Sequence, residues 1–348
     1  MNPGEYLAFS AVDLVGRSHQ HQSLIENQDR ERRKFNFFFS KSSPVSLWLF
    51  KKKTAGNCSI LFGGKVVVGP RWDGFLISLT FYLVLMASVL FQSHTLLPQS
   101  VLGWIVIATG STGLVLMLLT SLTNPGIIPR NESSTLPPGV DPKSIDSTTG
   151  YLIPRYLLIN GVCVRQKFCR TCKIYRPPRS NHCSICDNCV LKHDHHCLAL
   201  GTCVGLGNYR WFLLLCADMC ILFPSIFWLI KDQLFEMYYK EPDIATQEFI
   251  ANNLVSIIVL VSSLIGIGAF ALLFIYHFFI TSHNLTTNEH LKKYYKVNPF
   301  DYGRWANIKH ALCYPQELLP VEERLDVQAS YRELASTNSE CVSDFYDY

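Results

Sequence analysis

Long apolar runs, separated by polar segments, dominate the pattern along this chain. Four runs are about as long as a membrane span and carry almost no charge. A helix needs roughly 20 apolar residues to cross the ~30 Å hydrocarbon core of a bilayer, and four such runs are hard to bury in a soluble fold. A shorter alternating stretch at Ser59–Pro70 predicts a strand-turn-strand unit. The long runs predict four transmembrane helices, at Gly74–Phe91, Val101–Leu122, Trp211–Ile230 and Leu254–Ile280.

The loops between these runs predict the orientation in the membrane. The loop Gln92–Ser100 carries no charge, and the loop Lys231–Asn253 holds five acids against two lysines. Lys and Arg are instead enriched before the first run and between the second and third, and loops rich in them face the cytosol. We therefore expect both termini to be cytosolic. The expected divisions are 1–73 (N-terminal segment), 74–123 (first two spans), 124–210 (a cysteine-rich domain), 211–280 (last two spans) and 281–348 (C-terminal segment with a disordered tail).

Composition favours this fold class, a mainly α membrane protein. Charged residues make up 17% of the 348 residues and apolar residues 49%, whereas a typical soluble domain carries about a quarter charged residues. The net charge of +4 is too small to indicate a nucleic-acid partner. Membrane orientation is the simpler use of the basic residues, so the lipid bilayer is the partner that composition indicates.

Thirteen cysteines are present, and seven of them fall between Cys169 and Cys203. CxxC pairs interleaved with histidines are typical of metal ligation rather than of a disulfide framework. Metal-binding thiolates need a reducing compartment, which agrees with a cytosolic domain. The segment holds seven Cys and four His, whereas two tetrahedral structural zinc ions need eight ligands. Two zinc ions would therefore leave one Cys and two His without a structural task.

The surplus includes a candidate nucleophile. Cys197 and His195 are two residues apart, beside Asp194. A thiol next to an imidazole that a carboxylate orients is a typical activated nucleophile. Because the third apolar run begins at Trp211, we expect this thiol close to the membrane face, where a fatty acyl thioester could present its head group. The alternative is that Cys197 is one more thiol near the metal.

The run from Lys167 to Phe212 resembles the cysteine-rich domain of the DHHC protein S-acyltransferases, or palmitoyltransferases. Its spacing, Cys-x2-Cys-x9-His-Cys-x2-Cys-x2-Cys-x4-Asp-His-His-Cys-x5-Cys, matches that of the family without gaps. Motifs outside this run are also similar, so the resemblance covers residues 59 to 315 or so. They are Asn124-Pro125-Gly126 after the second run, Thr286-Thr287-Asn288-Glu289 after the fourth, and the set Asn298, Gly303 and Asn307.

The resemblance implies an activity and the residues that perform it. A palmitoyl or other long-chain acyl group would pass from acyl-CoA through an acyl-enzyme to cytosolic cysteines of membrane-associated proteins. Cys197 would be the acylated nucleophile, His195 its base and Asp194 the residue that orients the base. Thr287 would contact Asp194.

The resemblance also implies supporting residues and two structural zinc ions. Glu289 and Asn307 would hold the C-terminal segment against the core. The phosphates of CoA could meet Arg165, Lys167, Arg176 and Arg179, which could equally be solvated charges. One zinc ion would take Cys169, Cys172, His182 and Cys189, and the other Cys183, Cys186, His196 and Cys203.

The chain departs from the family pattern directly after Cys197, where Leu198 and Ala199 stand in place of Pro-Trp. Proline restricts φ and tryptophan suits a membrane interface, so we expect a lower rate or altered acyl selectivity. A zinc-binding membrane adaptor with weakened catalysis is the alternative, and release of CoA from palmitoyl-CoA would distinguish the two. A transporter or channel is a weaker third hypothesis, because the runs carry few ionisable residues of the kind that mark ion pathways, with Asp218 and His277 as the exceptions. For location, the resemblance implies an endomembrane, usually the Golgi, with the endoplasmic reticulum or plasma membrane as alternatives.

Overall fold

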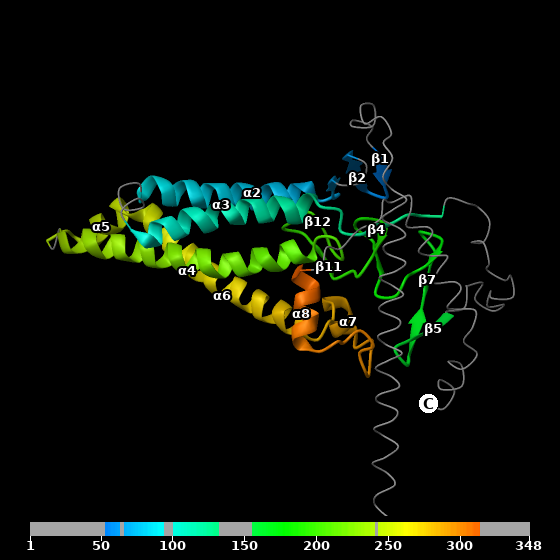
Figure 1. Ribbon diagram of the computed structural model, residues 1–348. Coiled ribbons are helices and arrows are strands. Elements are labelled where there is room, and N and C mark those ends of the chain that lie inside the picture. The colour runs from blue at the N-terminus through cyan, green and yellow to red at the C-terminus, as the bar shows by residue number, and fades with distance from the viewer. Residues whose placement is uncertain (1–52, 63–65, 94–99, 132–154, 241–242, 314–348) are drawn as a thin grey trace, which may run out of the picture. The chain divides into compact units, whose positions relative to one another are not determined.

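The structure is a computed structural model, which describes residues 53–62, 66–93, 100–131, 155–240 and 243–313. Within these residues, four helices are long and apolar enough to span a membrane, and they lie side by side in Figure 1. They are α2 (Trp72–Gln92), α3 (Val101–Leu122), α4 (Tyr209–Lys240) and α6 (Leu254–Ser282). The expected fold class, a mainly α protein with four spans, is confirmed. The predicted disordered tail lies outside the described residues.

The helix bounds follow the apolar runs, with one clear difference. Helix α3 has the predicted bounds, whereas α4 continues past Ile230 to Lys240. This extension carries an i,i+4 ion pair in which Lys240 Nζ lies 2.7 Å from Glu236 Oε1. A hydropathy pattern ends where charge begins, but helical hydrogen bonds do not need apolar side chains, so the helix continues into the polar region.

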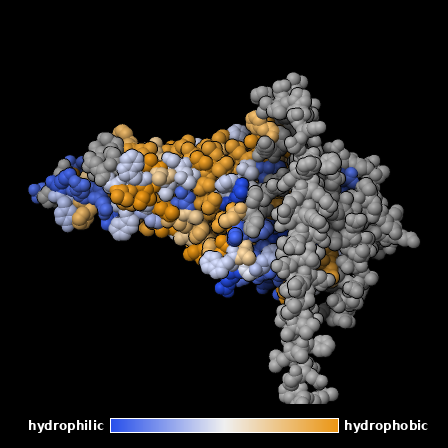
Figure 2. Space-filling view, in the orientation of Figure 1, coloured by the Kyte–Doolittle hydropathy of each residue, from blue (hydrophilic) through white to orange (hydrophobic). Residues whose placement is uncertain are grey.

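The outer surface of the helices is apolar. Figure 2 shows hydrophobic residues covering α2, α3 and α4, with hydrophilic residues near the end marked α5 (Thr246–Asn252) in Figure 1. On α2 alone, Ile77, Phe81 and Phe91 are each more than half exposed. Soluble proteins rarely expose apolar patches of this extent, so these faces are suited to lipid.

The interior of the bundle is built on close helix contact. Gly266 of α6 lies against the ring of Phe223 on α4, where a Cβ atom would come within 2.4 Å of the ring. The same ring stacks on Phe270 with 5.3 Å between centroids. Small residues at such contacts let helices in a membrane approach and gain packing energy, so α4 and α6 form the centre that positions the site.

Short antiparallel strands form the segment between α3 and α4. Strands this short bury little apolar surface, so we expect metal ligation to hold the segment together. One sheet has the order β4 (Ile127–Ile128), β10 (Asn188–Val190), β9 (Asn181–Cys183). The paired strands are β5 (Arg155–Ile159) with β6 (Val162–Gln166), β7 (Phe168–Cys169) with β8 (Ile174–Tyr175), and β11 (His195–Cys197) with β12 (Thr202–Val204).

The chain before α2 forms a small sheet of the order β1 (Lys53–Ala55), β2 (Cys58–Leu61), β3 (Val66–Val68). It contains the strand-turn-strand unit expected from the sequence and adds β1 to it. Asn57, in the turn between β1 and β2, donates its backbone N–H to the carbonyl of Cys186 at 3.0 Å. The N-terminal sheet therefore contacts the cysteine-rich segment.

After α6 the chain forms α7 (Thr287–Lys292) and α8 (Arg304–Cys313). A capping box begins α7: Thr286 Oγ1 accepts from the Glu289 N–H at 3.1 Å, and Glu289 Oε2 accepts from the Thr286 N–H at 2.9 Å. This arrangement satisfies two backbone donors that a helix start leaves free. Asn307 of α8 is buried and donates to the Ser282 carbonyl at 2.8 Å, which ties α8 to the end of α6.

Candidate functional site: two metal clusters and a Cys-His-Asp group

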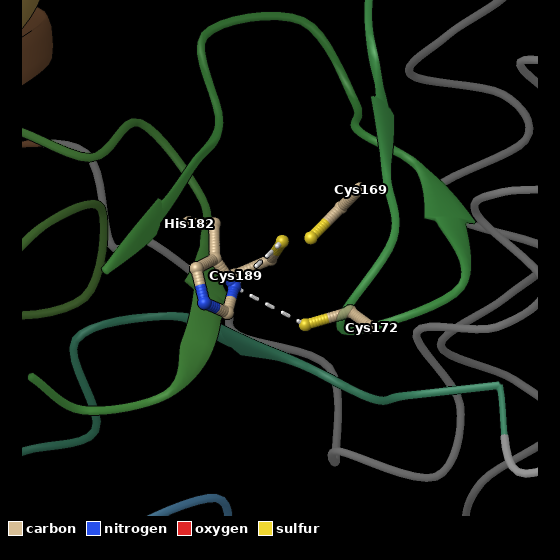
Figure 3. A group of neighbouring side chains, drawn as sticks. All are labelled: Cys169, Cys172, His182 and Cys189. Atoms are coloured by element: carbon tan, nitrogen blue, oxygen red, sulfur yellow. Dashed lines mark hydrogen bonds between the residues drawn. The ribbon is translucent and has the colours of Figure 1, made fainter. Parts of the chain in front are cut away.

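The first metal cluster draws its residues from β7, β9, β10 and the turn after β7. Figure 3 shows the three thiols and the imidazole pointing toward one another. His182 Nδ1 lies 3.5 Å from Cys172 Sγ and 3.8 Å from Cys189 Sγ. The other ring nitrogen of His182 faces Asp187 at 3.6 Å, and a carboxylate in that place orients a ligating imidazole. The members are Cys169, Cys172, His182 and Cys189.

The second metal cluster lies across β9, β11 and β12. His196 Nδ1 is 3.3 Å from Cys186 Sγ and 3.6 Å from the thiols of both Cys183 and Cys203. The backbone N–H of Cys186 also points at Cys183 Sγ, at 3.4 Å. The members are Cys183, Cys186, His196 and Cys203.

Both clusters match the ligand geometry of zinc. Bonds of ~2.3 Å to sulfur and ~2.0 Å to nitrogen in a tetrahedron place ligand atoms roughly 3.6 to 3.8 Å apart. Six of the distances between ligand atoms in the clusters are 3.3 to 3.8 Å, and all are within 4.8 Å. The structure thus brings together each predicted set of four, and each set could hold a metal ion.

Strand β11 places His196 on one face and the side chains of His195 and Cys197 on the other. Successive side chains of a strand point to opposite faces. His196 therefore faces the second cluster, while His195 and Cys197 lie on the other face. Pairing with β12 places Cys203 opposite His196 and Thr202 opposite Cys197. A metal ion held by His196 and Cys203 would thus clamp the hairpin that presents the Cys197 thiol.

Asp194 and His195 form a buried pair next to this thiol. Asp194 Oδ2 lies 2.7 Å from His195 Nδ1, and Asp194 Oδ1 accepts the backbone N–H of Thr287 at 2.8 Å. Burial raises the pKa of the Asp194 carboxyl, but the hydrogen bond with His195, the charges of His195 and His277 and the Thr287 N–H together outweigh burial and hold that pKa below its usual range. Burial also opposes charge on His195, but hydrogen bonds with Asp194 and Cys197 raise the pKa of His195 to about 9.

A third polar side chain, His277 of α6, completes this group. Ligand atoms of Asp194, His195 and His277 all lie within 4.8 Å of one another. The hydroxyl of Tyr209 lies 3.2 Å from His277 Nδ1, and the ring of Phe212 packs edge-on against His277, with 4.8 Å between centroids. The sequence shows His277 only as an ionisable residue within an apolar run. Its place beside Asp194 depends on the packing of α6 against α4.

Cys197 itself lies against apolar residues of the bundle. It is partly buried and packs with a cluster that includes Leu79, Met117, Phe212 and Leu273, so all four spans contribute to this cluster. The thiol is therefore at the membrane end of the cysteine-rich segment, beside apolar surface of a kind that an acyl chain could contact.

The turn after Cys197 rests directly on α2. A Cβ atom on Gly74 would lie 2.2 Å from the Leu198 carbonyl oxygen. Gly201 has φ +69°, a conformation that L side chains rarely adopt, and a Cβ there would lie 2.5 Å from the Arg71 carbonyl oxygen. Two glycines thus allow backbone to touch backbone. The side chain of Leu198 is exposed.

The four basic residues predicted to meet CoA line one cavity of about 280 Å³. Their environments differ. Arg179 donates to both carboxylate oxygens of Glu289, at 2.9 and 2.8 Å, so its charge is already paired. Lys167 lies over the ring of Tyr294 at 5.3 Å. The basic members are Arg165, Lys167, Arg176 and Arg179.

Known proteins match both this segment and most of the chain. The family model for DHHC palmitoyltransferase matches residues 163–294. Probable protein S-acyltransferase 3 of Arabidopsis thaliana is 30% identical over 88% of this chain and 78% of its own length. Palmitoyltransferase ZDHHC14 of Mus musculus is 32% identical over 82% of this chain and 63% of its own length. With the two Cys/His clusters between the second and third spans, these matches show that the chain belongs to the DHHC palmitoyltransferase family, as a protein-cysteine S-palmitoyltransferase.

Proposed function

We propose that the chain transfers a long-chain acyl group from acyl-CoA to protein cysteines through an acyl-Cys197 intermediate. The observation that carries this proposal is the position of Cys197, which shares a strand face with His195 and packs with a cluster of apolar residues drawn from all four spans. The polar pair activates a thiol, and the apolar surface suits the chain of the donor.

The first half-reaction is acylation of Cys197. Because His195 Nδ1 is held by Asp194, the other ring nitrogen takes the thiol proton. The thiolate attacks the acyl carbonyl carbon, a new carbon–sulfur bond forms, and the bond to the CoA sulfur breaks. CoA leaves as a thiolate that recovers the proton from the imidazolium, which the Asp194 carboxylate stabilises.

The second half-reaction reverses these roles. A cysteine of the target protein gives its proton to His195 and attacks the acyl-Cys197 carbonyl. The acyl group moves to the target, and the proton returns to Cys197. One thioester replaces another in each half-reaction, so neither step is strongly uphill. Two zinc ions would be held by the two clusters of four ligands, of which His196 and Cys203 lie on the hairpin, and they would stabilise the segment without supplying a group to the transfer.

We infer that the basic cavity receives the CoA phosphates. Lys167 and Arg165 contribute positive charge there, whereas Arg179 is neutralised by Glu289. Replacing Lys167 and Arg165 with Met should raise KM for palmitoyl-CoA and leave kcat nearly unchanged. An unchanged KM would place the phosphates elsewhere.

The orientation predicted from the loops places this site, both termini and the substrate cysteines on the cytosolic side of an endomembrane, such as that of the Golgi. Labelling of the exposed Cys313 by an impermeant thiol reagent, in sealed vesicles, tests this orientation.

Acylation of Cys197 is tested with purified protein and a palmitoyl-CoA probe. We expect hydroxylamine-sensitive label on the wild type, with release of free CoA, and neither in Cys197→Ser. Cys313→Ser, at an exposed cysteine, is the matched control and should keep both. Label that persists in Cys197→Ser would contradict the intermediate. A wild type that binds zinc but never releases CoA would favour the adaptor alternative, which draws no support from the relatives.

A further inference from the structure

Two side chains outside the eight ligands of the clusters lie against the second metal cluster. Cys58 on β2 is 1% exposed and packs with Cys183, Cys186 and Cys203 in one buried group. His193 is also buried, and its Nε2 lies 3.7 Å from Cys203 Sγ.

These two residues differ from the four ligands in geometry. His196 Nδ1 lies within 3.6 Å of three thiols, as a ligand to a central ion must. His193 Nε2 instead lies at a single thiol of the cluster, that of Cys203. Its other nitrogen, Nδ1, is buried without a hydrogen-bond partner, so the Cys203 thiol is the polar partner of this ring.

The position of Cys58 depends on the hydrogen bonds between the N-terminal sheet and the cysteine-rich segment. Asn57 donates its backbone N–H to the Cys186 carbonyl at 3.0 Å and its side-chain amide to the Ile185 carbonyl at 3.0 Å. Asn188 donates back to the Ala55 carbonyl at 2.6 Å. Gly56 has φ +53°, and a Cβ atom there would lie 2.3 Å from the Asp187 carbonyl oxygen. The β1–β2 turn therefore lies directly on the Cys183–Cys186 loop.

Zinc thiolates carry excess negative charge. A site of three Cys and one His has a net charge of −1 when its thiolates are ionised, and donors that reach the sulfur atoms spread that charge and orient the ligands. The S–H group of Cys58, packed among these thiols, and the N–H group of His193 at the Cys203 thiolate would act in this way.

We propose that Cys58 and His193 form an outer hydrogen-bonding shell around the second zinc site and couple the N-terminal sheet to the hairpin that presents Cys197. This inference rests on the zinc binding proposed above. It extends the site beyond its four ligands to a residue that precedes the first span, more than a hundred positions earlier in the sequence.

Zinc retention tests the proposal independently of acyl transfer when every variant carries Cys197→Ser. The purified chain is loaded with two zinc equivalents and challenged with EDTA, and zinc loss is followed over time. Loss of outer-shell partners typically weakens metal affinity 10- to 100-fold. Cys58→Ala and His193→Phe should therefore release one equivalent about tenfold faster or more, while the other equivalent leaves at the parent rate.

Further variants separate the outer shell from general damage to the fold. His193→Gln keeps an N–H donor and should recover most of the retention lost in His193→Phe. Gly56→Ala, which lifts the turn without removing either donor, should resemble Cys58→Ala. Cys313→Ser is the matched cysteine control. Equal release rates in parent, Cys58→Ala and His193→Phe would overturn the outer shell, whereas a parent that binds no zinc would instead overturn the proposed zinc sites.

Discussion

The ion pair between Arg179 and Glu289 joins α7 to the cysteine-rich segment. Breaking this pair tests how the C-terminal segment supports the site. The Arg179 side chain is 10% exposed and that of Glu289 2%. Two parallel hydrogen bonds join them, and Arg179 also donates to the Asn284 side chain and carbonyl, at 2.9 and 2.7 Å. Thr287, two residues before Glu289 in the chain, donates its backbone N–H to Asp194.

Glu289→Gln preserves the shape of the side chain and removes its charge. Removing one partner of a buried pair costs about 3 to 5 kcal/mol, because the other charge stays buried without compensation. A loss of 1 kcal/mol lowers the melting temperature of a large domain by about 2 °C, so we expect a decrease of roughly 6 to 10 °C. The acylation rate should also fall, because a looser α7 no longer holds Asp194 through Thr287.

Thermal unfolding in detergent, followed by intrinsic fluorescence, measures this decrease. The double variant Arg179→Met/Glu289→Gln removes both charges and keeps a side-chain oxygen to accept the Thr286 N–H of the capping box, so no buried charge is left without compensation. It should recover most of the lost stability, and with it part of the acylation rate. If Glu289→Gln melts within a degree or two of the wild type, the pair does not hold α7 in place and the reasoning is wrong.

Three further predictions concern the surroundings of the thiol. Gly74→Ala should lower the acylation rate at least tenfold, because its Cβ would displace the Leu198 carbonyl, whereas Gly268→Ala, which has open space, should not; equal rates in the two variants would refute the contact. His277→Phe keeps the ring packing but loses both nitrogens, and kcat for acylation should fall roughly tenfold with KM unchanged; a rise in KM alone would instead assign the residue to donor binding. Burial, and next the charge of Arg179, lower the pKa of Lys192 from 10.5 to about 7. Below pH 7 the side chain is charged in both the folded and the unfolded chain, so the folded state bears the full free-energy cost of burying that charge. This cost declines as the pH rises from 7 toward 10.5. Lys192→Met should therefore stabilise the protein more at pH 6 than at pH 9.5, as measured by melting temperature, and a gain that does not depend on pH would show that the folded-state pKa is not depressed.

Local patterns in the sequence were sufficient for the spans and the metal ligands. Apolar runs specify transmembrane helices because the bilayer requires about 20 apolar residues in a row, and the bounds of α3 agree with its run. The ligand count works because CxxC pairs are typical of ligands to one ion, whereas the division into two interleaved sets of four came from the family resemblance. The alternation of a strand explains why His196 faces the second cluster while His195 and Cys197 do not, although β11 itself was not predicted.

Tertiary structure decided which distant residues meet around these local elements. Glu289 lies 110 positions from its partner Arg179, and no spacing rule connects Cys58 with Cys186 or His277 with Asp194. Such contacts arise when helices and sheets pack against one another. They therefore depend on the complementary shapes of the packed elements and not on the periodicity of the sequence. The sequence alone thus indicated four spans, a segment with enough Cys and His ligands for two metal ions, and a candidate nucleophile. Only the folded chain determined what holds Asp194, what surrounds His195 and what lies behind the second metal cluster, because these are set by packing between segments far apart in the chain.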